Sequence, residues 1–320
     1  MSFPIPVAFR GALALALAAC VACSRVEQAA PGGSAPAKPV RIVATSATAV
    51  DIVAALVEPG RIAGFPVQAL EYSSLHAEPP QFAAIAKFEA YLAEPVLALR
   101  PDLVVIDPWQ APETSARLRE AGVSVLALPE VRGLEDAYAA LRAVAQAVGE
   151  PERAERLQGE LEKRCEGLRE RAAKRSGARE PLRALCYSNF GGAGSTAGSG
   201  TTVHAMFELV GLRNLTAERG TVGHTAATFE DLLALDPDLI VTSQPLKMGE
   251  GSSGDRGGAS GKLLRTEPML AGLRAVREDR IVALPAWLFA SGSHELVTGA
   301  EKLESEVEAL LARLEGEAHK

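Results

Sequence analysis

The sequence predicts an α/β protein with two similar lobes, each built on a parallel-type central sheet. A long rigid helix joins the lobes, and a ligand cleft lies between them. Three observations lead to this prediction: a phrase of eleven residues that occurs twice, an alternation of strand-like and helical segments, and one long charged helical stretch between the copies. Such alternation is typical of a parallel sheet covered by helices.

The repeated phrase reads LALRPDLVVID at residues 97–107 and LALDPDLIVTS at residues 233–243. Eight of the eleven positions are identical or exchange Val for Ile, at an offset of 136 residues. This offset is far longer than the roughly 20–50 residues of stacked repeats, so it indicates a doubled domain. Each copy predicts a helix that ends at a Pro-Asp turn, followed by a strand buried on both faces.

The first lobe is expected to contain strands and helices in turn, with an irregular segment at residues 68–84. Its other expected strands are residues 40–44, 61–65 and 123–128, and its expected helices are residues 49–57, 89–99 and 112–121.

Two helical segments, residues 134–148 and 151–174, follow the first lobe. The second is rich in Glu, Arg and Lys and has a thin apolar stripe at helical spacing. Its about 24 residues would extend roughly 36 Å at ~1.5 Å per residue. We therefore expect a stiff strut between the lobes that permits only modest motion on binding.

The second lobe is expected to repeat the order of the first. Its expected strands include residues 182–187 and 281–284, and its expected helices are residues 201–210, 229–235 and 293–314; residues 249–261 form a low-complexity Gly-rich loop. The predicted boundaries are a signal peptide at 1–19, a tether at 20–38, lobes at 39–132 and 177–316, and a helical connector at 133–176.

The N-terminus reads as an export signal. Residues 11–19 form an apolar run about half as long as the ~20 residues that cross a bilayer. Small residues precede Cys20, as in the lipobox of bacterial lipoproteins, so Cys20 is the expected lipidation site; an ordinary secretory signal is the alternative. The Pro-, Gly- and Ala-rich residues that follow suit a flexible tether.

Composition excludes some classes of function. The chain has 320 residues, 23% of them charged, and a net charge of −7, so we expect no nucleic acid as partner. Cys165 and Cys186 could form a disulfide in an exported protein. Because they fall in a helical and a strand pattern, we favour buried free thiols over this alternative.

Two motifs point to other functions. Residues 192–197 match the G-x-G-x-x-A dinucleotide fingerprint, but the next helix is expected only from Thr201, so the glycines would not open it. The histidines are few and none are closely spaced. A bare divalent metal could be held only if His76 and His224 converged with carboxylates from both lobes.

The chain contains two Trp, four Tyr and nine Phe, and several follow predicted strands. Carboxyl ends of parallel strands are where ligands bind in open α/β sheets, and aromatic rings there form flat apolar walls. The expected cleft residues are Tyr72, Trp109, Tyr187, Phe190 and Trp287.

Residues 40–314 resemble the cell-envelope solute-binding proteins of ABC importers for cobalamin, ferric siderophores and haem. The resemblance rests on Arg41-Ile42-Val43 followed by Ser46, on both L-x-P-D phrases, on Gly200-Thr201-Thr202 followed by Glu208-Leu209-Val210-Gly211 and Asn214, and on the long strut.

The resemblance implies roles for particular residues. Asp51 and Glu208 stand where the family has carboxylates that dock onto permease arginines, although Asp51 replaces the usual Glu. Tyr72, Trp109, Phe190 and Trp287 stand where cobalamin-binding members have cleft aromatics. His224 replaces another aromatic and could be an axial contact to a chelated metal.

We therefore expect a substrate-binding lipoprotein, not an enzyme, which needs no cofactor and carries a metal chelate to an ABC permease with its ATPase. It is expected to be a monomer in the periplasm, anchored to the membrane of the bacterial cell envelope. The alternatives are a carrier of a bare divalent metal ion, a nucleotide-dependent oxidoreductase and a membrane-tethered signalling adaptor.

Overall fold

The computed structural model describes residues 38–77, 79–89, 91–189, 194–246 and 257–318, and residues 38–320 form one compact unit. The expected signal peptide, Cys20 and the tether up to residue 37 therefore lie outside the described residues. Among the helices that the structure describes, none has the length and apolarity that a membrane crossing needs.

The first lobe is built on a five-stranded sheet in the order β3-β2-β1-β4-β5, in which all neighbours are parallel. Its strands are β1 (Ile42–Ala44), β2 (Ile62–Pro66), β3 (Ala86–Phe88), β4 (Leu103–Ile106) and β5 (Ser124–Ala127). Its helices are α1 (Ala47–Leu56), α2 (Ala69–Tyr72), α3 (Ala93–Ala98) and α4 (Pro112–Glu120), with short 3₁₀ turns η1 (Pro59–Arg61), η2 (Ser74–Ala77) and η3 (Pro80–Phe82).

The second lobe has a four-stranded parallel sheet in the order β11-β10-β6-β8 and a separate antiparallel pair β7-β9. The strands are β6 (Arg183–Cys186), β7 (Ser195–Ala197), β8 (Arg213–Asn214), β9 (His224–Ala226), β10 (Leu239–Gln244) and β11 (Ile281–Pro285). The helices are α7 (Thr202–Leu209), α8 (Leu215–Glu218), α9 (Phe229–Leu235), α10 (Gly258–Thr266), α11 (Arg274–Arg277), α12 (Ala286–Phe289) and α13 (Glu295–Ala318), with the 3₁₀ turn η4 (Pro268–Leu270).

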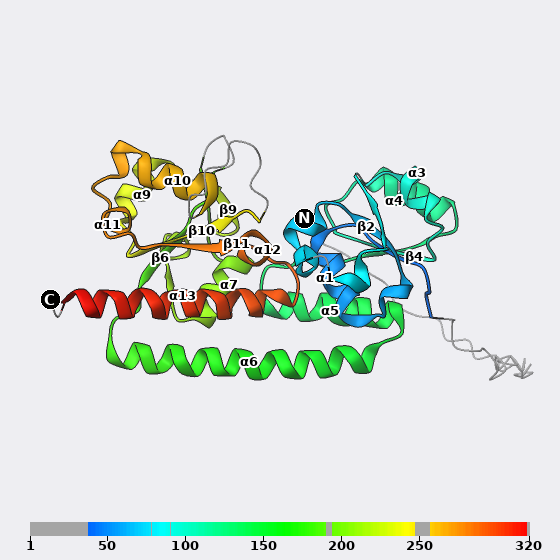
Figure 1. The fold of residues 1–320 in the computed structure, drawn as a ribbon, viewed down its shortest axis with the longest axis horizontal. Helices are drawn as coiled ribbons and strands as arrows, with labels where there is room; N and C mark the ends of the chain where they lie inside the picture. The colour runs from blue at the N-terminus through cyan, green and yellow to red at the C-terminus, as the bar shows by residue number, and fades with distance from the viewer. Residues whose placement is uncertain (1–37, 78, 90, 190–193, 247–256, 319–320) are drawn as a thin grey trace, which may run out of the picture. The chain divides into compact units, whose positions relative to one another are not determined.

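The two lobes confirm the predicted fold class, and the repeated phrase has the same structure in each (Figure 1). Each copy ends a helix with one residue in the left-handed region, Arg100 at φ 48° and Asp236 at φ 38°. A proline and an aspartate follow, and the next residues enter β4 or β10. Both strands are buried and lie inside their sheets, as the apolar runs predict.

The aspartate of each phrase holds the start of a neighbouring strand. Asp102 accepts hydrogen bonds from the backbone N–H groups of Val40 (2.8 Å) and Arg41 (3.0 Å), just before β1. Asp238 accepts from the Arg183 backbone N–H at 3.0 Å, at the start of β6. The duplicated Pro-Asp turn therefore sets the alignment of two central strands in each lobe.

The helical connector consists of α5 (Leu134–Val148) and α6 (Pro151–Ala178), which contact each other (Figure 1). The 28-residue α6 is four residues longer than the sequence predicts. Ala154 packs into the core of the first lobe, whereas Leu161, Cys165 and Leu168 pack into the core of the second. The predicted apolar stripe thus binds α6 to both lobes.

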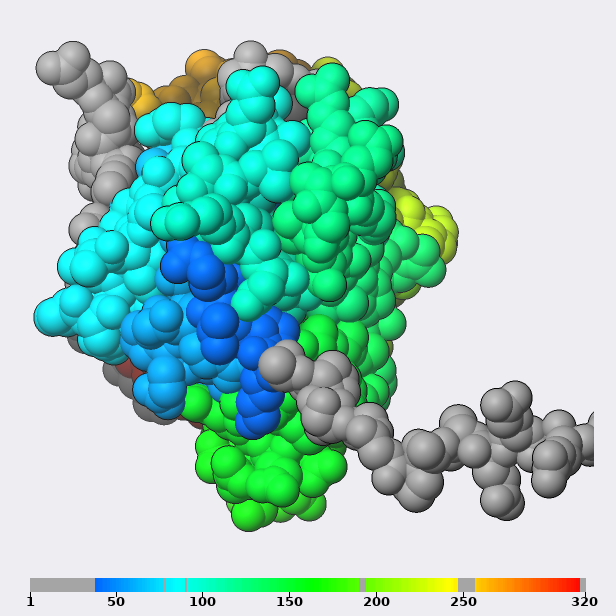
Figure 2. All heavy atoms as spheres, turned by 90° about the vertical axis from the view of Figure 1, so that its right-hand side faces the viewer, coloured from blue at the N-terminus to red at the C-terminus, as the bar shows by residue number. Residues whose placement is uncertain are grey.

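Some elements differ from the predictions. The helix expected at residues 89–99 is shortened to α3, because residue 89 follows strand β3 and α3 begins only at Ala93. The pair β7-β9 was not predicted, since β9 is exposed along its whole length and neither short strand is an apolar run, unlike β1. Figure 2 shows the blue and cyan residues of the first lobe facing the viewer, with green residues of α6 at their lower edge. Cys165 and Cys186 are buried free thiols, as expected.

Candidate functional site

A cavity of about 310 Å³ is lined by residues of both lobes. The first lobe contributes residues at the start of α1 and Tyr72 of α2, and the second contributes the ends of β6 and β10, the pair β7-β9, and the segment 286–292. The start of α1, the ends of β6 and β10 and the segment after β11 lie at the carboxyl ends of parallel strands, which is where open α/β sheets bind ligands. The expected cleft between the lobes therefore contains an actual cavity.

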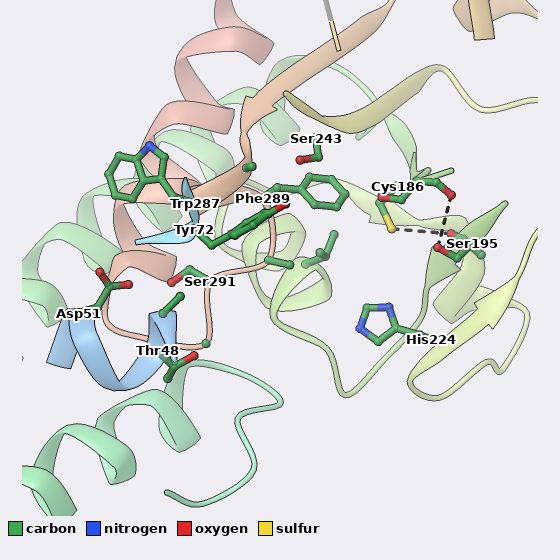
Figure 3. A pocket seen from close by; sticks show the side chains of 17 residues that line it. Thr48, Asp51, Tyr72, Cys186, Ser195, His224, Ser243, Trp287, Phe289 and Ser291 are labelled. Carbon is green, nitrogen blue, oxygen red and sulfur yellow. Dashed lines mark hydrogen bonds between the residues drawn. The ribbon is translucent and has the colours of Figure 1, made fainter. Parts of the chain in front are cut away.

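Aromatic rings form the centre of this cavity (Figure 3). In this view the Tyr72 ring lies between the rings of Trp287 and Phe289, and His224 faces the same space from strand β9. Tyr72 is 47% exposed, so its ring presents its surface to a ligand instead of filling the core. The structure brings Tyr72, His224 and Trp287 together from segments far apart in the sequence.

A ring contact joins the two lobes beside this cavity. The imidazole of His76 in η2 stacks on the indole of Trp287 in α12, with ring centroids 4.6 Å apart and an angle of 26° between the planes. The two residues belong to different lobes. The stack therefore fixes the position of the Trp287 indole in the cavity wall as long as the two lobes keep their relative positions. The sequence suggested only a metal-ligand role for His76. Its contact with Trp287 could not be predicted, because it depends on how the two lobes pack.

Asp51 does not lie on the protein surface. It is 2% exposed, and its Oδ1 accepts hydrogen bonds from the backbone N–H and the hydroxyl of Ser74, both at 2.7 Å. Its Oδ2 accepts from the hydroxyl of Ser293 in the second lobe at 2.8 Å. Burial raises the pKa of the carboxyl to about 7, and the nearby Glu295 charge also raises it, against the hydrogen bonds.

The expected permease-docking role of Asp51 is therefore corrected. A carboxylate closed in between the lobes cannot reach an arginine of another protein. The shorter side chain keeps the carboxyl close to α1, where the two serines enclose it. Asp51 is a residue of the lobe interface and of the cavity wall.

A second cavity, of about 390 Å³, lies on the first-lobe side of Tyr72. It shares Ala47, Thr48 and Tyr72 with the first cavity and includes Trp109, whose side chain is 76% exposed. Asp107 lies in its wall, and burial raises the pKa of this carboxyl to about 6, against a hydrogen bond from Ser46. Trp109 therefore lines a neighbouring compartment and not the cavity that contains Trp287.

Two other expected cleft residues have different outcomes. Tyr187 is fully buried in the core of the second lobe with Leu185 and Ile240, and it does not line the cavity. It follows strand β6, as predicted, but its side chain packs into the hydrophobic core beside the sheet. Phe190 lies outside the described residues.

The Gly-rich motif at residues 192–197 does not have the form of a dinucleotide site. Its last three residues are strand β7, paired with β9, and helix α7 begins only at Thr202 with Thr201 as its N-cap. The described part of the motif, residues 194–197, thus leads into strand β7 and not into a helix N-terminus, which the fingerprint requires.

Glu208 lies on α7 with 67% of its side chain exposed, and its Oε1 lies 3.6 Å from Nε2 of His204. It lines a shallow third cavity together with Arg132 and Arg169. Its exposure is compatible with the expected contact to a permease.

Sequence reasoning missed the polar wall of the first cavity. Thr48, Ser195, Ser243 and Ser291 line it, as does Cys186, whose buried thiol has a pKa raised to about 11. Serine and threonine are so frequent in turns that a single one does not indicate a binding site. Their only signal in the sequence is their position just after strands or at helix starts.

Among the residues that the structure describes, no group of three or more His, Cys, Asp or Glu side chains could hold a metal ion.

Comparison with known proteins agrees with this architecture. Residues 42–288 match the sequence model of the family described as "Periplasmic binding protein". No curated protein is detectably similar in sequence.

Several solved structures share the fold. The periplasmic heme-binding protein RhuT from Roseiflexus sp. RS-1 is 24% identical, with a TM-score of 0.71 over 84% of this chain and 98% of that one. A periplasmic heme-binding protein from Pseudomonas aeruginosa is 25% identical, with a TM-score of 0.70 over 83% and 92%. An ABC-type Fe³⁺-hydroxamate transport system from Saccharomonospora viridis is 22% identical, with a TM-score of 0.66 over 84% and 93%. With the family match covering most of the sequence, this chain belongs to the periplasmic binding protein family.

Proposed function

We propose that this protein is the substrate-binding component of an ABC importer, and that it binds a metal chelate in the cavity between its lobes and delivers it to a membrane permease. The observation that carries the proposal is the aromatic cavity itself, in which Tyr72, Trp287 and Phe289 offer flat apolar surfaces. The solved relatives described above include proteins named for heme and for Fe³⁺-hydroxamate. Membership of a periplasmic binding protein family supports a location in the cell envelope and a carrier role without catalysis.

His224 is the proposed contact to the metal. Its imidazole faces the cavity from β9 and is exposed, so either ring nitrogen could reach an iron or cobalt centre held against the aromatic rings. The chelate would supply most of the coordination, so one protein ligand is enough.

Titration with corrinoids, haem and ferric siderophores, followed by thermal shift and by tryptophan fluorescence, tests the function. The chain has two tryptophans, Trp287 in the first cavity and Trp109 in the second, which give a matched pair of variants. We expect Trp287→Ala to weaken binding of the chelate about 10-fold or more, since the lost ring is a wall of the site, and Trp109→Ala to have a smaller effect.

Protection by zinc or manganese, together with none by any chelate, would contradict the proposal and favour the carrier of a bare divalent ion. Stabilisation by a nicotinamide dinucleotide would favour the oxidoreductase alternative. No stabilisation by any small molecule would favour the signalling adaptor.

We further propose that Cys20 carries the lipid anchor, that Glu208 docks onto the permease, and that the carrier works as a monomer. The exposure of Glu208 supports its part in this proposal. Loss of metabolic lipid labelling in Cys20→Ser tests the anchor. Loss of uptake by Glu208→Ala, with ligand affinity unchanged, tests the docking.

A further inference from the structure

The walls of both compartments beside Tyr72 contain no lysine and no arginine among the described residues. The first cavity has 17 lining residues, which include one carboxyl, that of Asp51, and one imidazole, that of His224. The second cavity has the carboxyls of Glu89 and Asp107 in its wall. The remaining lining groups are apolar side chains, hydroxyls, amides, phenols and one thiol.

This absence is local, because the chain contains 33 lysines and arginines in all. The third cavity, on the other side of α7, includes Arg132 and Arg169. Other arginines are engaged in ion pairs between elements, such as Arg164 with Glu301 and Arg175 with Glu304, which join α6 to α13. In the part of the chain that the structure describes, the walls of the interlobe cavities thus differ in charge from the rest of the surface.

A charged ligand that leaves water needs compensating charge or strong hydrogen bonds in its site. Sites for anionic groups therefore present Arg or Lys side chains. The walls here present the hydroxyls of Thr48, Ser195, Ser243 and Ser291, which suit neutral amide or hydroxamate oxygens. Ionised carboxyls in the same walls repel a negative ligand and attract a positive one.

We propose that the site is selective for metal chelates that are neutral or positively charged, the class that includes ferric trihydroxamates and corrinoids, and that it rejects chelates whose negative charge surrounds the metal, such as ferric tris-catecholates. The inference rests on the proposed function and adds the charge class of the ligand. Burial raises the pKa of Asp51 to about 7 and that of Asp107 to about 6, so at pH 8 both carboxyls are ionised and the selection is at its strongest.

The test compares chelates of similar size at pH 8 by calorimetric titration of the purified chain. The panel contains a neutral and a cationic ferric trihydroxamate, a neutral corrinoid, a ferric tris-catecholate of charge −3, haem, and haem dimethyl ester. We expect the tris-catecholate to bind about 100-fold or more weakly than the best neutral or cationic chelate, since like charges in a partly desolvated site are strongly unfavourable. The dimethyl ester is expected to bind at least as tightly as haem.

A charge variant tests the cause. Ser243 lies half-buried in the cavity wall at the end of β10, and Ser243→Lys adds a positive charge there. We expect it to strengthen tris-catecholate binding about 10-fold and to weaken cationic chelate binding. Ser243→Met has similar length without charge, and it should change the affinities for all chelates alike.

The outcomes separate the two proposals. Equal or tighter binding of the tris-catecholate by the unaltered protein overturns the charge inference and leaves the carrier function supported. Binding of no chelate at all overturns the carrier function. If Ser243→Lys fails to fold, the panel on the unaltered protein still decides the inference.

Discussion

Asp51 shows how one side chain can belong to the fold and to the site at once. Its carboxyl is enclosed by Ser74 of the same lobe and Ser293 of the other, and it also lines the cavity. Three short hydrogen bonds stabilise the charged form, yet burial outweighs them and raises the pKa to about 7. The carboxyl therefore changes its charge near neutral pH, at the contact between the lobes.

We predict that Asp51→Asn reduces the pH dependence of stability. Below pH 3.8 the carboxyl is neutral in both the folded and the unfolded protein, so it has no effect there. Between pH 3.8 and about 7 the folded protein holds the extra proton, so the free energy of unfolding decreases as the pH rises, and above 7 the loss is complete. From pH 5 to pH 8 the loss is about 3 kcal/mol.

Urea denaturation at pH 5 and at pH 8 checks this prediction. The difference in unfolding free energy between the variant and the unaltered protein should move in favour of Asn at the higher pH. Asp107→Asn is the matched control, with a smaller change because the pKa of Asp107 is raised only to about 6. An equal difference at both pH values would show that the Asp51 carboxyl titrates normally.

His224 is the second residue with a prediction of its own. If its imidazole contacts a chelated iron or cobalt, His224→Ala should shift the visible absorption bands of the bound chelate, because an axial ligand has been lost. Thr225→Ala, the next exposed residue on β9, should leave the bands unchanged. If His224→Ala and the unaltered protein give the same spectrum with bound chelate, His224 is not an axial ligand.

At the scale of elements, each lobe depends on the turn that precedes its central strand. The duplicated turn joins strands through equivalent contacts in both halves: the Arg41 side chain donates to the Leu99 and Arg100 carbonyls, and the Arg183 side chain donates to the Asp236 carbonyl at 2.7 Å. These pairs link the start of one strand to the turn before its neighbour. The phrase is therefore a structural element of the sheet, and its last residue, Asp107 or Ser243, reaches a cavity wall.

We predict that Asp102→Ala destabilises the protein by about 2 kcal/mol. The substitution removes the acceptor for the backbone N–H groups of Val40 and Arg41 and leaves them without this partner. Urea denaturation measures the change. Glu120→Ala, at an exposed position on α4, is the control and should change the unfolding free energy by less than about 0.5 kcal/mol; a similar loss in both variants would contradict this role of Asp102.

At the scale of the whole molecule, the contacts that join the lobes include three that bear on the cavity. Helix α6 packs into both cores, Asp51 bonds to Ser293, and His76 stacks on Trp287. A continuous helix resists bending, and the other two contacts hold the lobes together beside the cavity without the need for a ligand. The cavity is therefore formed before binding, as ligand pockets usually are.

We predict that binding of the chelate changes the arrangement of the lobes very little. Small-angle scattering of the purified protein should give radii of gyration with and without chelate that agree within about 1 Å. His76→Ala removes the stack on Trp287 and is expected to increase the difference, while His204→Ala, on α7 and away from this contact, is the control. A large closure in the unaltered protein would contradict the rigid connection.

The sequence by itself determined the architecture. The alternation of apolar runs and helical stripes, the two Pro-Asp turns and the long charged helix are local or periodic patterns, and backbone sterics and burial of one face translate them directly into elements. They were enough to predict two parallel α/β lobes, the long helix that joins them and the positions of Tyr72 and Trp287 near strand ends. His224 was expected in the cleft only from the family resemblance.

Only the tertiary structure decided which of these side chains meet. A residue after a strand can point into the cleft, as Trp287 does, or into the core, as Tyr187 does, and the pattern around both is similar. The burial of Asp51 and the stack of His76 on Trp287 depend on how two lobes distant in sequence face each other. So does the absence of Lys and Arg from the described residues that line the cavities beside Tyr72. Contacts between distant segments have no periodicity along the chain, so the sequence pattern alone cannot contain them.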